Sequence, residues 1–185
     1  MIFGFICGGI TVLVIVTAMR WAVGFRAQKP QDYAHKTPVF DIREHFNGNI
    51  LCEGMIYGPF GRVTSRFVAQ MQAEWDGDTC KMVEYFNYDS GLKQTREWTL
   101  TLHPDGCIAA DAPDLRGTGQ GRQLGAAVQL QYRIKLPPSA GGHVLDVVDW
   151  MYLLDNGTIM NRSQFRKFGI KVAELVATMR PETGA

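Results

Sequence analysis

The sequence lacks the common signatures of catalysis and metal binding. It contains no Gly-x-Ser-x-Gly motif, which argues against a hydrolase nucleophile on a sharp strand-to-helix turn. Its 4 histidines are scattered, and none stands at metal-ligand spacing from a Cys, Asp or Glu. The sequence therefore predicts no metal and no cofactor, and a catalytic function is the less favoured interpretation.

The chain also lacks an excess of charge of either sign. Its 19 Lys and Arg residues balance 18 Asp and Glu residues, for a net charge of +1 at pH 7. No basic patch stands out, so we expect no nucleic-acid partner. The spacing Gly117-x-Gly119-x-Gly121 resembles a phosphate loop only superficially, because no helix and no Lys-Ser/Thr pair follows it. We interpret these glycines as a mobile connection between strands.

Charges are missing altogether between Ile2 and Met19. An uncharged stretch of this length can just span a bilayer as a helix, which needs about 17–25 residues. A cleaved signal peptide is less favoured because no basic residue precedes the stretch, and lipidation of Cys7 is less favoured because small residues do not precede it. A buried core helix is the alternative. We therefore predict a transmembrane helix and a single-pass membrane protein.

The basic residues beside the predicted helix indicate its orientation. Arg20, Arg26 and Lys29 all follow the uncharged stretch, and none precedes it. The positive-inside rule then favours the cytoplasm for the rest of the chain. Three of the 4 cysteines lie beyond the helix, at Cys52, Cys80 and Cys107. An odd number cannot all pair within one chain, which agrees with a reducing compartment.

The remainder of the chain begins with a linker and a short helical turn. Pro30 and Pro38 stand among mostly polar neighbours and mark the linker. Asp41 with Glu44 three residues later is a capping-box-like pattern, which predicts one or two helical turns before Gly48. The predicted segments are a transmembrane helix (1–25), a linker (26–40), a folded domain (41–181) and a tail (182–185).

From residue 50 onward the pattern is that of an all-β domain. Apolar and polar residues alternate with a period of two, most clearly between Leu124 and Leu136. Turn signals such as Gly58-Pro59 and Asp76-Gly77 recur at short intervals. Strands joined in sequence order by tight turns form an antiparallel meander, and about 8–9 strands are enough to close one into a barrel. A two-sheet sandwich is the alternative.

The first candidate site lies on the hairpin around residues 89–91. A three-residue loop that ends in glycine pairs Glu84 with Arg96, and both share a face with Trp98. Burying either charge alone would be costly, whereas a hydrogen-bonded pair is tolerated. One interpretation is a structural ion pair that fixes the register. The other is the polar end of a ligand cavity, in which Arg96 meets a carboxylate or phosphate head group.

The second candidate site is the hairpin over residues 147–162. Its Asn-Gly pair predicts a two-residue type I′ turn, which sets Tyr152 opposite Asn161. Trp150 then shares a face with both residues, and Asp149 falls on the opposite face. We predict either core packing or contacts to a ligand from Trp150, Tyr152 and Asn161.

Several sequence phrases resemble a bacterial family known as domain of unknown function 3833. The last hairpin is the most specific of them, and the others support it by their order and spacing. The resemblance implies an envelope-associated, lipocalin-like domain with no assigned activity. Many relatives look like secreted lipoproteins, which favours the periplasm and conflicts with the positive-inside rule. The matching phrases are Phe40-Asp41-Ile42, Glu53-Gly54, Phe60-Gly61-Arg62, Glu84-x-Phe86-x-Tyr88, Arg96-x-Trp98, Asp149-Trp150-Met151-Tyr152, Asn161-Arg162 and Lys167-Phe168-Gly169.

These observations combine into one prediction. We expect a non-catalytic lipocalin-like barrel, anchored at the bacterial inner membrane, that binds or presents a lipid-like or fatty-acid-like molecule. One alternative is a filled barrel that docks on a membrane-enzyme partner, and a less favoured one is an enzyme acting on a lipid-like substrate. The expected ligand-binding residues are Glu84, Arg96, Trp98, Tyr132, Trp150, Tyr152 and Asn161.

Overall fold

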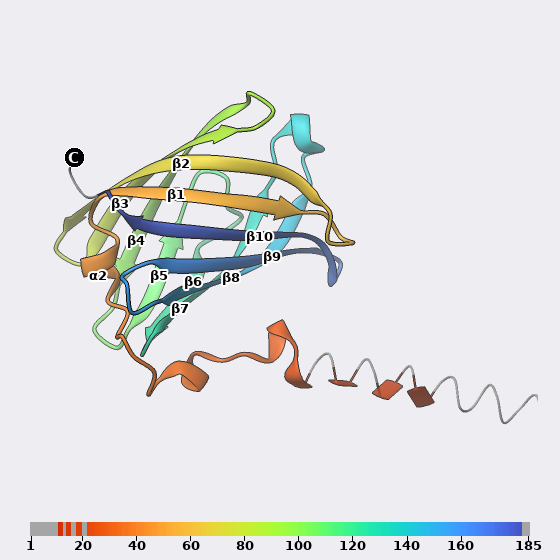
Figure 1. Ribbon diagram of the computed structural model, residues 1–185, viewed down its shortest axis with the longest axis horizontal. Helices are drawn as coiled ribbons and strands as arrows, with labels where there is room; N and C mark the ends of the chain where they lie inside the picture. Colours follow the sequence, from red (N-terminus) through yellow and green to blue (C-terminus); the bar gives the residue numbers. More distant parts are fainter. Residues whose placement is uncertain (1–10, 13, 16–17, 20–21, 183–185) are drawn as a thin grey trace, which may run out of the picture.

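Ten antiparallel strands follow one another in sequence order and close into a barrel, in which β1 pairs with β10 (Figure 1). The computed structural model describes residues 11–12, 14–15, 18–19 and 22–182. The strands are β1 (Gly48–Tyr57), β2 (Val63–Asp76), β3 (Thr79–Tyr88), β4 (Lys93–Leu102), β5 (Cys107–Asp111), β6 (Gly119–Leu124), β7 (Ala127–Lys135), β8 (Val144–Leu153), β9 (Ile159–Lys167) and β10 (Ile170–Pro181). The short helices are η1 (Phe25–Ala27), η2 (Pro30–Tyr33), α2 (Ile42–His45) and η3 (Pro138–Ala140).

The predicted all-β meander that closes into a barrel is confirmed, but the predicted count of 8–9 strands is too low. The glycine-rich segment is a strand, β6, and not the mobile connection that we expected. Gly121 pairs with Leu130 on β7, and a Cβ atom at Gly121 would lie 2.3 Å from the Leu130 side chain. Glycine is needed where β7 approaches so closely, and it leaves no hydrophobic alternation by which the strand could be recognised.

One end of the barrel is closed by α2 and the residues beside it (Figure 1). The Asp41 side chain accepts a hydrogen bond from the backbone N–H of Arg43, so the predicted N-cap is confirmed. Phe40, Ile42 and Phe46 are almost completely buried. They close the barrel with apolar surface, and we call this the closed end.

The opposite end is formed by the five hairpin loops that lie away from α2. We call it the open end, because side chains of the inner wall keep part of their surface exposed there, as described below. Its loops are 58–62, 89–92, 112–118, 136–143 and 168–169.

A strap of residues 25–40, which contains η1 and η2, runs along the outside of the barrel before α2 (Figure 1). The Tyr33 ring lies 5.4 Å from that of Trp150 and 5.2 Å from that of Tyr152. Both tyrosine hydroxyls donate to the same side-chain oxygen of Gln28, at 2.6 and 2.7 Å. The strap therefore covers the outer face of β8.

The predicted single-pass placement in the bacterial inner membrane is contradicted. Among the residues that the structure describes, no helix is both long enough and apolar enough to cross a bilayer. Residues 1–10, 13, 16–17 and 20–21 of the predicted helix lie outside the described part of the chain, as do residues 183–185 of the predicted tail.

The β8–β9 hairpin differs from its prediction by one residue. Its loop contains three residues between Leu154 and Thr158 rather than two, and Gly157 has φ +78°. Asn161 therefore pairs with Met151, one position away from the predicted partner. Because side chains alternate along a strand, a shift of one residue transfers Asn161 to the other face relative to β8.

Candidate functional site

The inner wall of the barrel changes in character from the closed end to the open end. Near α2 it is apolar and fully buried, with Cys80 and Ile159 both at 0% exposure. Halfway along the barrel, Glu84 and Tyr132 have 7% and 9% of their surface exposed, although the strands around them are paired without a gap. Nearer the open end, half-buried side chains line the wall: Ile56, Phe86, Tyr88, Leu136, Phe165 and Leu175. The half-buried side chains of the inner wall thus lie mainly toward the open end.

Arg96 holds two acidic side chains at this middle level. The predicted pairing of Glu84 on β3 with Arg96 on β4 is confirmed, and their nearest charged atoms, Oε2 and Nη1, are 3.6 Å apart. The Arg96 Nε and Nη2 atoms donate to the two carboxylate oxygens of Asp114 at 2.8 and 3.2 Å. Such a two-point contact is the strongest form of arginine–carboxylate pairing.

An aromatic ring covers one face of the Arg96 guanidinium group. Its central carbon lies 4.7 Å from the centre of the Trp98 ring, a cation–π distance. The Tyr132 ring meets Trp98 edge to face at 5.3 Å. Arg96, Trp98 and Tyr132 therefore form one packed unit on the inner wall, and the predicted shared face of Arg96 and Trp98 is confirmed.

A second polar group lies on β8 and β9. Ser163 pairs with Asp149, and the serine hydroxyl donates to Asp149 Oδ1 at 2.8 Å. The side-chain amide of Asn161 donates to the same oxygen and also to the backbone carbonyl of Trp150. Asp149, Asn161 and Ser163 share the inner face, because Asp149 pairs with Leu130 on β7. We call Glu84, Arg96, Asp114, Asp149, Asn161 and Ser163 together the polar cluster.

Burial favours the neutral form of two acids in the cluster. It raises the pKa of the Glu84 carboxyl, an effect that the charge of Arg96 partly opposes. It also raises the pKa of the Asp149 carboxyl, although hydrogen bonds from Ser163 and Asn161 oppose it. Burial raises the pKa of the nearby Cys52 thiol to about 12, so this cysteine stays protonated and is a poor nucleophile.

Trp150 and Tyr152 lie apart from this cluster. Both project from the outer face of β8 beneath the strap, and Trp150 is 0% exposed. The predicted shared face of Trp150, Tyr152 and Asn161 is wrong, because the one-residue change of register sends Asn161 into the barrel. The structure thus brings Glu84, Arg96, Trp98, Tyr132 and Asn161 together and separates the other two predicted residues from them.

The sequence did not identify three members of the cluster. Asp114 lies in the loop between β5 and β6, where no periodic pattern relates it to Arg96 on β4. Asp149 and Ser163 were hidden by the wrong register, although a three-residue loop ending at Gly157 would have paired them. A polar residue on an otherwise apolar strand face is the signal that could have identified both.

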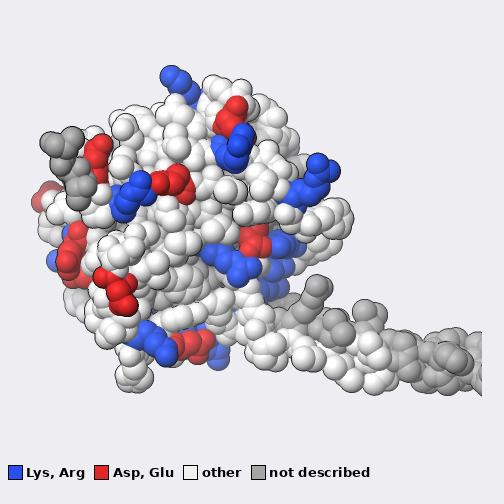
Figure 2. Space-filling view, in the orientation of Figure 1, with Lys and Arg blue, Asp and Glu red and all other residues white. Residues whose placement is uncertain are grey.

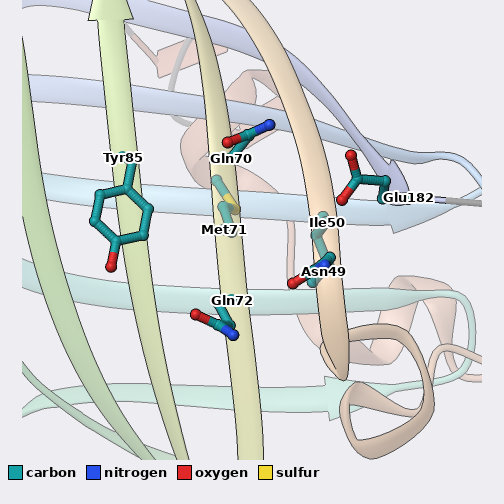
Figure 3. A pocket seen from close by; sticks show the side chains of 7 residues that line it. All are labelled: Asn49, Ile50, Gln70, Met71, Gln72, Tyr85 and Glu182. Atoms are coloured by element: carbon teal, nitrogen blue, oxygen red, sulfur yellow. The ribbon is translucent and has the colours of Figure 1, made fainter. Parts of the chain in front are cut away.

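A small cavity of about 120 Å³ lies on the outer wall near the start of β1 (Figure 3). Its lining side chains come from β1, β2, β3 and the residue after β10: Asn49, Ile50, Gln70, Met71, Gln72, Tyr85 and Glu182. Ligand sites usually measure about 300–1,000 Å³. This cavity is therefore too small to be the candidate site.

The outer surface carries mixed charge, with basic and acidic side chains close to one another on the face shown in Figure 2. Several of them form ion pairs: Arg43–Asp78, Arg66–Asp89, Arg162–Glu174 and Arg180–Glu53. Within the described part of the chain, no three His, Cys, Asp or Glu side chains are placed to hold a metal ion.

Comparison with solved structures shows the fold. An S-type phycobiliprotein lyase, CPES, from Guillardia theta matches with a TM-score of 0.59 at 8% identity, over 85% of this chain and 99% of its own. Rv2717c from M. tuberculosis matches with a TM-score of 0.56 at 13% identity, over 80% of this chain and 99% of its own. A redesigned β-barrel, mFAP0, bound to DFHBI matches more weakly, with a TM-score of 0.42 at 14% identity, over 74% and 99%. At 8% and 13% identity, the first two matches show only that this barrel has the same fold as proteins of known structure.

Comparison with families is more specific. The model of one family, described as "Protein of unknown function (DUF3833)", matches residues 19–181. No curated protein matches the chain.

Proposed function

This chain belongs to the DUF3833 family of proteins of unknown function, and from that premise we propose that its barrel binds a small, mainly apolar molecule with one polar end. One observation carries the proposal. A group of titratable and polar side chains lies halfway down the inner wall, and the inner-wall side chains between it and the open end include several that are only half-buried. A barrel stabilised only by packing has no need for three carboxylic acids at this level, since each is costly to bury.

The wall above the polar cluster suits an apolar ligand body. Phe86, Tyr88 and Phe165 are half-buried on the inner wall, so each keeps apolar surface that a ligand could cover. Covering such surface stabilises a complex by roughly 25 cal/mol per Å². A lipid-like molecule would place its chain against these side chains and its polar end at the cluster.

The closed end restricts the direction of binding. Phe40, Ile42 and Phe46 fill that end, and water does not reach the inner wall beside them. A ligand would therefore enter between the open-end loops. Ala173, on the inner wall opposite Phe165, stands at this entrance and has a small side chain.

The test is to extract the purified full-length chain with organic solvent and identify any released molecule by mass spectrometry. Ala173→Trp should block the entrance and greatly reduce the amount recovered. Val68→Trp is the matched control, because Val68 is 60% exposed on the outer wall and should not affect recovery. If equal amounts of the same molecules come from both variants, they are not bound in the barrel and the proposal fails.

A second candidate function is docking on a protein partner. It is favoured by Phe60 and Phe168, which are 97% and 90% exposed at two open-end loops. A docking module predicts a barrel that releases no molecule on extraction. It also predicts that Phe60→Ser and Phe168→Ser abolish the cellular role while Ala173→Trp preserves it.

A further inference from the structure

The polar cluster contains more acid than base. Glu84, Asp114 and Asp149 supply three carboxyl groups, whereas Arg96 is the cation that acts on the pKa values of both Glu84 and Asp149. We propose that the polar end of the bound molecule donates hydrogen bonds or carries a positive charge, as an amine does, and is not a carboxylate or phosphate. This inference rests on the proposed binding function and names the chemical class of the ligand.

Arg96 has little capacity left for an acidic ligand. Two of its nitrogens donate to Asp114, a third faces Glu84, and its flat face lies on Trp98. An incoming carboxylate would have to displace Asp114 from a two-point contact. It would then add a fourth acid beside three others, which Coulomb repulsion at a partly desolvated site opposes.

Glu84, by contrast, has an acceptor atom without a donor. Its Oε2 atom is buried and accepts no hydrogen bond, although it lies 3.6 Å from Arg96 Nη1 in an ion pair, and the Glu84 side chain is 9% exposed. Leaving such an atom without a donor costs free energy, which a ligand N–H group would recover. This missing hydrogen bond is an observation separate from the acid count, and a ligand donor would complete it.

A hydrogen-bond donor on the ligand would also suit the Asp149 carboxyl group. Both of its hydrogen bonds from Ser163 and Asn161 reach the same oxygen, Oδ1. A ligand ammonium near Glu84 and Asp149 would favour their charged forms and so oppose the effect of burial. The acids that are costly in the empty barrel would thus become favourable in the complex.

The experiment compares three probes with the same alkyl chain: decylamine, decanol and decanoate. Their affinities for the full-length protein are measured by isothermal titration calorimetry at pH 7. We expect decylamine to bind at least tenfold more tightly than decanoate, with decanol between them. We also expect the affinity for decylamine to fall as the pH is lowered, because the amine stays charged while the acids of the cluster take up protons.

Two double variants locate the effect. Glu84→Gln with Asp149→Asn should reduce the preference for decylamine over decanoate to less than threefold. Glu97→Gln with Asp146→Asn removes the same charge from exposed positions on the outer faces of β4 and β8 and should leave the preference unchanged. Near-ultraviolet circular dichroism checks that both variants fold.

The outcomes separate the two proposals. Tighter binding of decanoate that Ala173→Trp abolishes would overturn the inference about the ligand but support a binding site in the barrel. If both double variants prefer decylamine over decanoate by the same factor, the polar cluster does not determine the choice of ligand. If Ala173→Trp affects the binding of none of the three probes, the proposed function fails and the inference fails with it.

Discussion

Ser163 on β9 and Asp149 on β8 lie directly opposite each other on the inner wall, and the serine hydroxyl donates to the aspartate at 2.8 Å. This contact, together with that from Asn161, supports an acid that burial would otherwise make unfavourable in its charged form. It also depends on the hairpin register, because a shift of one residue would remove Ser163 from the inner wall.

Ser163→Ala should lower the free energy of unfolding by about 1–3 kcal/mol, the cost of leaving a buried acceptor without one of its donors. Urea unfolding at pH 7 measures the change. Ser65→Ala is the control, because Ser65 donates to Asp89 at 3.3 Å in an exposed contact at the open end and its loss should cost less than about 0.5 kcal/mol. Equal losses in the two variants would contradict a special role for the inner contact.

The two hairpins show how far the sequence could predict the fold. The loop at residues 89–91 ends in Gly91 with φ +84°, and the predicted pairing of Glu84 with Arg96 followed correctly. The Asn-Gly pair at 156–157 is compatible with loops of two or of three residues, and local turn preference alone does not choose between them. Burial chooses here: the three-residue loop places Asp149 with Ser163 inside and Trp150 beneath the strap. The sequence does not show that the strap exists.

Asp114 could not be predicted for a different reason. It belongs to a loop and reaches Arg96 across a gap of 18 positions in the sequence. Alternation of side chains relates residues within one strand or hairpin, but it does not predict where a side chain of an irregular loop will reach.

Arg96→Met should lower the free energy of unfolding by about 3–5 kcal/mol, because Glu84 and Asp114 would lose their buried partner. Adding Glu84→Gln to Arg96→Met should recover part of this loss, since one unpaired acid is then removed. A double-mutant cycle by chemical unfolding at pH 7 measures the coupling between the two residues. Strictly additive losses would show that the 3.6 Å separation carries no energetic interaction.

The stability of the protein should depend on pH through Glu84. Because burial raises the pKa of this acid, the folded protein holds the proton to a higher pH than the unfolded chain does. The stabilisation is fully present below the ordinary glutamate pKa and is lost as the pH rises through the higher folded value. Glu84→Gln lacks this loss, so its stability relative to the native protein should increase from pH 4 to pH 8.

Urea unfolding at several pH values provides this comparison. Glu97→Gln is the matched control, because Glu97 is the neighbouring exposed acid on the outer face of β4. Its stability relative to the native protein should change little with pH. A Glu84→Gln protein that loses relative stability as the pH rises would mean that Glu84 is held in its charged form.

Gly125→Ala should test the contact between the barrel and the strap. A Cβ atom at Gly125 would lie 1.8 Å from the backbone oxygen of Tyr33, and the residue has φ +55°. Gly157→Ala is the matched control, because Gly157 also has positive φ but open space around its Cβ position. The control should cost about 1–2 kcal/mol for the backbone conformation. Gly125→Ala should cost about 1–3 kcal/mol more, from overpacking.

Tryptophan fluorescence reports separately on the inner wall and on the strap. If the strap lifts in Gly125→Ala, Trp150 gains contact with water and its emission shifts to longer wavelength. Gly157→Ala should show no such shift. A Gly125→Ala protein with native stability and native emission would show that the strap does not pack on the barrel as described.

The same fluorescence distinguishes the two candidate ligand sites that the sequence suggested. Trp98 lies on the inner wall beneath Arg96, whereas Trp150 lies outside the barrel and is 0% exposed beneath Tyr33. A ligand in the barrel should therefore change the emission of Trp98 and leave that of Trp150 unchanged. We expect Trp98→Phe to remove most of the emission change caused by decylamine and Trp150→Phe to preserve it. The opposite result would mean that the ligand binds beneath the strap and that the polar cluster is structural.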